Sequence, residues 1–161
     1  MQRRLEPELM NGDTQVQAYA AADFSSGDQA TIEAIQRLLS RTPPLPPDPL
    51  VVDLGCGPGN ITLRLAGLFP KARIIGIDGA ESMLAVARER AQQQQLEISF
   101  LCQTLQEVLR GALLGQADLI VSNSLLHHLH QPDLLWMVTR DLAAPGCRTL
   151  HRDLRRPASD A

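Results

Sequence analysis

The chain has 161 residues, which suits one domain with a continuous apolar core. It is 44% hydrophobic and 20% charged, as is ordinary for a globular protein in water. A formal net charge of -3 and few aromatic residues (three Phe, one Trp and one Tyr) argue against a nucleic-acid binder, which needs a basic surface or a stacking platform. We therefore expect no nucleic-acid partner.

The first 41 residues predict a helical segment. Turn signals over 11–13 and 25–27 flank a short helix over 14–22. A firmer helix is predicted over 28–41, because Ile32, Ile35, Leu38 and Leu39 recur at three- and four-residue spacing. The proline-rich residues 42–49 then predict a stiff, extended connector, since proline lacks an amide donor and restricts the residue before it.

Residues 50–161 predict a domain in which strands and helices alternate. The expected strands are 50–54, 73–77, 97–101, 117–122 and 147–151, and the expected helices are 59–69, 80–94, 105–114 and 132–143. Pro145 and Gly146 are expected to turn the chain before the last strand. Such alternation implies an α/β fold: an open, mostly parallel sheet with helices on both faces.

A glycine-rich turn follows the first strand, over residues 53–60 (DLGCGPGN). Its glycines let the backbone approach a ligand closely, and the next helix offers unpaired amides to an anion. The spacing G-x-G-x-G differs from the dinucleotide pattern G-x-G-x-x-G, because Asn60 stands where the third glycine is needed. Asp53, two positions before Gly55, would repel a phosphate and attract an ammonium group.

This turn resembles the first motif of class I S-adenosylmethionine-dependent methyltransferases, of the small-molecule type. The resemblance covers residues from about 50 to 157 and implies a Rossmann-like sheet of strand order 3-2-1-4-5. It also implies S-adenosylmethionine as the cofactor. The residues expected to bind that cofactor are Asp53, Gly55, Cys56, Gly57, Asp78, Gly79, Met83, Gln103, Thr104 and Asn123.

Asp78 ends the second predicted strand, near the interval at which an acidic residue can grip ribose hydroxyls. The segment that follows resembles the family's D-x-S-x-x-M-L pattern, which places Met83 against adenine. After the third strand, Gln103 stands where the family usually has an acidic residue for the adenine amine. Either its side-chain amide accepts that bond, or the backbone amides there contact the ring.

The fourth strand runs into S-N-S-L-L-H-H-L over residues 122–129, which resembles a run of small-molecule methyltransferases. Carbonyls near Asn123 would face the methionine part of the cofactor. His128 is the one candidate for a catalytic or substrate role, because imidazole titrates near neutral pH. For His127, the preferred interpretation is a side chain without a chemical role, which caps, packs against the sheet or is solvated.

Family members continue with a helix and an antiparallel strand pair, for which this sequence has no counterpart, so we expect a chain truncated at its C-terminus. The fifth strand would then be an exposed edge able to pair with a second copy. The scattered cysteines predict no metal site and no disulfide framework. Without a leader or a long apolar run, a cytoplasmic protein with no membrane partner is expected.

The expected activity is methyl transfer from S-adenosylmethionine to a small-molecule acceptor. Such a transfer is a direct displacement that needs the attacking atom, the methyl carbon and the sulfur in line. Two alternatives stay open: a degenerate cofactor-binding module without turnover and, disfavoured by the glycine spacing, an NAD-dependent oxidoreductase.

Overall fold

The computed structural model describes residues 12–154 and contains a parallel sheet of five strands in the order β3-β2-β1-β4-β5. The strands are β1 (Leu50–Leu54), β2 (Arg73–Asp78), β3 (Ile98–Cys102), β4 (Ala117–Asn123) and β5 (Ala143–Arg152). The helices are α1 (Asp13–Ala21), α2 (Ser25–Leu39), α3 (Asn60–Leu68), α4 (Glu81–Gln93), α5 (Leu105–Val108) and α6 (Asp133–Leu142). The α/β class and the strand order predicted from the sequence are confirmed.

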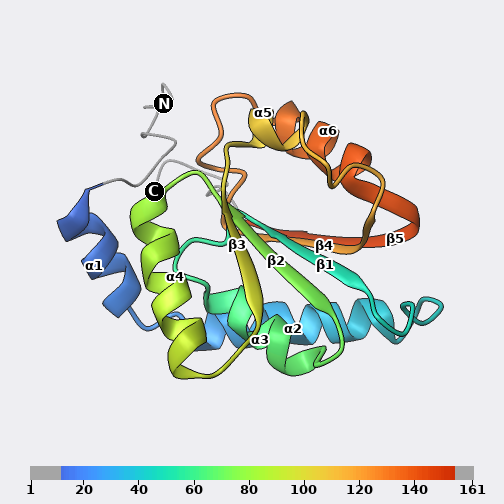
Figure 1. Cartoon of the computed structure of the whole chain (residues 1–161), viewed down its shortest axis with the longest axis horizontal. Coiled ribbons are helices and arrows are strands. Elements are labelled where there is room, and N and C mark those ends of the chain that lie inside the picture. The colour runs from blue at the N-terminus through green and yellow to red at the C-terminus, as the bar shows by residue number, and fades with distance from the viewer. Residues whose placement is uncertain (1–11, 155–161) are drawn as a thin grey trace, which may run out of the picture.

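Apolar residues cover both faces of the sheet because successive strand residues point to opposite sides. In β1, Val52 and Leu54 pack into the cluster under α5 and α6, and Val51 packs into the cluster under α2 and α3. Ile35 of α2 is fully buried in that second cluster. Figure 1 shows α5 and α6 on one face, α2 and α3 on the other, and α1 outside α4.

Two helices differ from their predicted bounds by more than one residue. The first, α2, begins at Ser25 instead of 28 and ends at Leu39 instead of 41. Just before it, the Asp23 carboxylate accepts the Ser25 backbone N–H at 2.9 Å. The second, α5, ends at Val108 instead of 114. The turns that replace the rest of it let Leu109 and Leu113 pack separately against the core, next to the poor helix former Gly111.

The fifth strand begins earlier than predicted. Ala143 already pairs with Ala117, whereas Arg148 pairs with Leu119, so four residues of β5 stand opposite one of β4. Pro145 and Gly146 lie within this bulge and do not turn the chain before the strand. A bulge accommodates them because proline cannot donate to the ladder and Gly146 has a φ of 81°.

A histidine joins β5 to its neighbours. The hydroxyl of Thr139 in α6 donates to the Leu135 carbonyl, so it accepts from Nε2 of His151 at 3.2 Å. Nδ1 of His151 then accepts from the Ser122 hydroxyl of β4 at 2.7 Å. Burial lowers the pKa of His151, in agreement with a neutral ring in this position.

None of the helices in the described part of the chain has the length and apolarity to cross a membrane.

Candidate functional site

A cavity of about 490 Å³ opens at the carboxyl ends of the strands, where open α/β sheets bind ligands. It lies at the switch point of the topology, since the chain moves from β1 to β2 on one side and to β4 on the other. The cavity brings together all ten residues predicted to bind the cofactor and His128. Within residues 12–154, no group of three or more His, Cys, Asp or Glu side chains is arranged to hold a metal.

The glycine turn forms the floor of the cavity. Gly55 and Cys56 donate their backbone N–H groups to the Ile77 carbonyl of β2, at 2.8 and 3.0 Å. Gly57 has a φ of 51°, and a Cβ built on it would meet no atom within 4 Å. Its backbone therefore borders open space in the cavity, where a ligand can approach without meeting a side chain.

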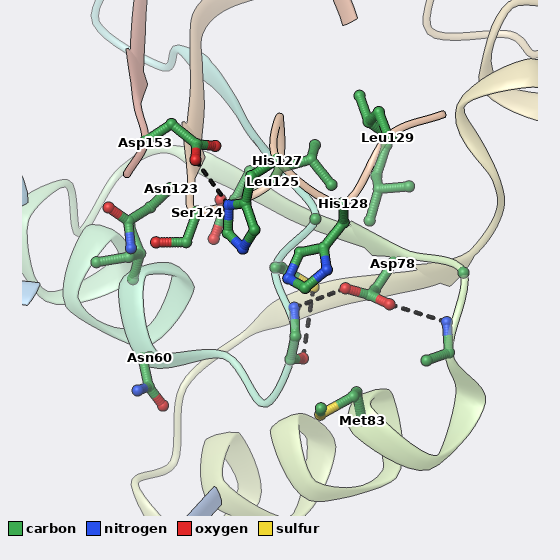
Figure 2. A pocket seen from close by; sticks show the side chains of 18 of the residues that line it. Asn60, Asp78, Met83, Asn123, Ser124, Leu125, His127, His128, Leu129 and Asp153 are labelled. Carbon is green, nitrogen blue, oxygen red and sulfur yellow. Dashed lines mark hydrogen bonds and ion pairs between the residues drawn. The ribbon is translucent and has the colours of Figure 1, made fainter. Parts of the chain in front are cut away.

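Asp78 joins this turn to the start of α4. Its Oδ2 accepts the Gly57 N–H and its Oδ1 accepts the Ala80 N–H, each at 2.8 Å (Figure 2). Burial raises the pKa of Asp78, although these bonds and the charge of His128 oppose the shift. Each carboxylate oxygen has a second acceptor position, so the pair can also bind two neighbouring hydroxyls.

Asp53 lies deeper, only 1% exposed, and accepts the Thr62 hydroxyl at 2.6 Å. Burial raises its pKa to about 7, and the nearby carboxylates of Asp78 and Asp28 also raise it. A cationic ligand group in the cavity would favour the ionised form of Asp53. The geometry therefore suits a ligand that carries an ammonium group near the turn and hydroxyls near Asp78.

Met83 and the segment after β3 also line the cavity. Met83 is 3% exposed and packs with Val16 of α1. The backbone N–H of Gln103 donates to the Asp78 carbonyl at 3.0 Å, and that of Thr104 donates to Glu107 Oε2 at 2.7 Å. Both amides are thus engaged within the protein.

The two histidines have different partners. His127 Nδ1 lies 2.7 Å from Asp153 Oδ1, and the Leu126 backbone N–H donates to Oδ2 of the same carboxylate at 2.6 Å. His127 is therefore tied to the end of β5. His128 lies with its ring centroid 4.0 Å from that of His127 and on the side of Asp78 (Figure 2).

Several lining residues carry no motif that sequence reasoning could have found. They are Tyr19, Phe24, Asp28, Arg152 and Asp153. Arg152 Nη1 donates to the Gly27 carbonyl at 2.7 Å and to the Thr31 hydroxyl at 2.9 Å, across more than 120 residues of sequence. Thr31 in turn donates to Asn123 Oδ1 at 2.9 Å. These bonds join α2, β4 and β5 at the rim of the cavity.

Comparison with known proteins identifies one matching family, and the relatives reported below are named as methyltransferases too. Residues 51–146 match the model of a methyltransferase domain. A trans-aconitate 2-methyltransferase of Variovorax paradoxus is 45% identical over 114 residues, which are 69% of this chain and 40% of that protein. A malonyl-[acyl-carrier protein] O-methyltransferase of Bacillus anthracis is 41% identical over 80 residues, or 50% of this chain and 28% of that protein. The chain covers less than half the length of either relative.

Solved structures agree on the fold. A putative S-adenosylmethionine-dependent methyltransferase from Methanococcus maripaludis superposes with a TM-score of 0.73 at 17% identity. The match covers 94% of this chain and 66% of that structure.

Proposed function

The chain belongs to the class I S-adenosylmethionine-dependent methyltransferases, and from that premise we propose that it methylates a carboxylate oxygen of a small acid. The observation that carries the proposal is the presence of Arg152 in the same cavity as the glycine turn and Asp78. The glycine turn and Asp78 suit the cofactor, and in the same cavity Arg152 offers a cation to an anionic acceptor.

The chain's own residues would hold the cofactor as follows. Asp78 would accept the ribose hydroxyls, and Met83 and Gln103 would border the adenine. Asp53 and the open backbone at Gly57 would surround the methionine part. Gly55, Cys56, Gly79, Thr104 and Asn123 complete the proposed lining.

A carboxylate acceptor sets modest demands on the protein. Its lone pair forms the new C–O bond while the S–CH3 bond breaks and leaves its electron pair on sulfur, which gives a methyl ester and a neutral thioether. A carboxylate is already ionised at neutral pH, so no proton has to be removed. The protein's task is to exclude water and align the reacting atoms, and His128 need not act as a base.

The relatives' names agree with this acceptor class, since both the aconitate and the malonyl enzymes are named for acids. The test combines binding and transfer. Calorimetry should detect binding of S-adenosylhomocysteine and no binding of NAD. In the transfer assay, a labelled methyl group should move from S-adenosylmethionine to acids such as trans-aconitate. Base should release that label as methanol, because esters hydrolyse and methylated amines or carbons do not. A base-stable product, or binding of NAD alone, would refute the proposal.

The second candidate is a cofactor-binding module without turnover. It is favoured by Gln103, which stands where the family usually has an acidic residue for the adenine amine. In that case S-adenosylhomocysteine binds, but no label reaches any acid, amine or phenol.

We also propose a second copy of the chain as a partner along β5. Within the described residues β5 is an edge strand, pairing with β4 alone. Light scattering across a range of concentrations tests this: a mass that stays monomeric at high concentration contradicts it.

A further inference from the structure

Ser124 has an unusual backbone conformation at the rim of the cavity. It follows β4 directly and has a φ of 58°, a region that residues other than glycine and asparagine seldom occupy. Its N–H donates to the Arg152 carbonyl at 2.8 Å, and the next residue, Leu125, packs over Gly55. The surrounding structure thus holds Ser124 in a conformation that costs energy.

One other non-glycine residue with positive φ exists among residues 12–154, and it has a different setting. Gln95 has a φ of 55°, lies in the exposed turn between α4 and β3, and does not line the cavity. Its conformation only reverses the chain. Ser124 lines the cavity, and in Figure 2 its side chain lies near those of Asn123 and His127. The strained residue Ser124 therefore lies at the surface of the cavity, whereas the strained residue Gln95 lies outside it.

Arg152 is fixed beside Ser124. It pairs in register with Asn123, the residue before Ser124. Its two hydrogen bonds to α2 both leave from Nη1, whereas a guanidinium carries five N–H donors in a planar fork. The side chain is exposed and also lines the cavity. Such a tethered fork is prepared for a carboxylate, because little side-chain entropy remains to be lost on binding.

We propose that Ser124 and Arg152 form the acceptor site and select an acid with at least two carboxylates. Arg152 binds a carboxylate that is not methylated, and the Ser124 hydroxyl donates to the acceptor beside the transferred methyl group. This inference rests on the proposed function and adds its substrate class. Both residues position the acceptor, and neither takes part in bond making.

The first test compares glycine variants at the two strained positions. Ser124→Gly and Gln95→Gly each relieve a positive φ, so both should keep or raise the melting temperature. Only Ser124→Gly should raise KM for trans-aconitate, by about tenfold, since it loses a hydrogen bond to a charged group. The Kd for S-adenosylhomocysteine should not change in either. If Ser124→Gly leaves KM unchanged, as Gln95→Gly does, Ser124 has no role in acceptor binding.

The second test measures preference between acids. The wild type should methylate trans-aconitate faster than crotonate, which keeps one carboxylate on a trans double bond. Arg152→Gln should lower the ratio of these two rates by about tenfold or more. Arg152→Lys should restore part of it, because it returns the charge without the fork. A general loss of folding would lower both rates and leave their ratio unchanged. An unchanged ratio in Arg152→Gln overturns the inference.

The two proposals can fail separately. Calorimetry of trans-aconitate with chain saturated by S-adenosylhomocysteine measures acceptor binding without turnover. Binding that depends on Ser124 and Arg152, without methyl transfer, would refute the proposed activity and keep the acceptor site. Methyl transfer to an acid, with the same acid preference in the variants as in the wild type, would keep the proposed activity and refute the acceptor site.

Discussion

At the scale of single residues, Gly57 is where one methyl group would most affect the cavity. Its φ of 51° and the open space beside it leave the backbone exposed to a ligand. Gly57→Ala should therefore weaken S-adenosylhomocysteine binding, by about tenfold or more, because the new methyl group enters the ligand's space and strains the turn. Calorimetric titration measures the change.

Gly115 provides the matched control for Gly57. It also has positive φ, 71°, and open space around it, but it lies outside the cavity. Gly115→Ala should lower the melting temperature to a similar degree, since the backbone cost of about 1–2 kcal/mol is shared. It should leave the Kd unchanged. Equal losses of affinity in both variants would mean that Gly57 acts through stability alone.

Asp53 predicts how stability changes with pH. Its folded-state pKa, about 7, lies above the ordinary value of 3.8, so the folded chain holds a proton that the unfolded chain releases. The free energy of unfolding should therefore fall as pH rises between about 4 and 7, with a slope of up to about 1.4 kcal/mol per unit from this group. Asp53→Asn removes that contribution, so it should gain stability relative to wild type between pH 5 and pH 8. Urea unfolding at both pH values measures the difference, and a constant difference would contradict the assignment.

The same ionisation predicts a pH dependence of ligand binding. An ammonium group near Asp53 favours its carboxylate, so wild-type affinity for S-adenosylhomocysteine should rise from pH 5 to pH 8. In Asp53→Asn this part of the rise should disappear. Calorimetry at the two pH values is the measurement, and a parallel rise in both proteins would place the titrating group elsewhere.

At the scale of elements, α1 is the weakly attached one. It begins without a side-chain cap and packs on α4 through a small cluster of Val16, Tyr19, Ala80, Met83 and Val86. The Tyr19 ring also contacts that of Phe24, with 4.8 Å between the ring centroids. Tyr19 and Met83 also line the cavity, so a bound ligand would add contacts to both sides of this cluster. S-adenosylhomocysteine should therefore slow amide hydrogen exchange in α1, by about tenfold or more.

Exchange measured by mass spectrometry tests this, with residues 36–39 at the end of α2 as an internal reference away from the cavity. Val16→Ala should weaken ligand binding severalfold with little loss of global stability, because it loosens α1 alone. Equal protection of α1 with and without ligand would contradict the assignment of α1 as a cover.

The elements differ in how well sequence predicts them. Strand β1 was predicted to the residue, and β2 and α4 to within one, because their apolar spacing and flanking turns are local. The start of β5 was not, because its bulge depends on the register with β4. The same distinction holds for the site. The glycine turn and Asp78 carry a local pattern, whereas Ser124 and Arg152 gain meaning only where distant segments meet.

At the scale of the whole molecule, the N-terminal helices contribute unequally to the core. Ile32 and Ile35 of α2 are buried against strand and α3 residues, and Thr31 connects α2 to Asn123 and Arg152. Burial of two such side chains contributes about 3–6 kcal/mol, and removal of α2 would also uncover the apolar face beneath it. That loss is comparable with the whole stability of a typical domain, about 5–15 kcal/mol.

Two truncations should therefore behave differently. A chain starting at residue 23 lacks α1 and should unfold cooperatively, with a melting temperature near that of the full chain and weaker binding of S-adenosylhomocysteine. A chain starting at residue 42 lacks α2 as well and should lose cooperative unfolding and bind hydrophobic dyes, because the face formed by Val51, Leu119 and Val121 becomes exposed. Circular dichroism and calorimetric melting distinguish the two. A cooperative transition in the shorter chain would mean that residues 42–161 fold without α2, and that this helix serves the rim of the cavity alone.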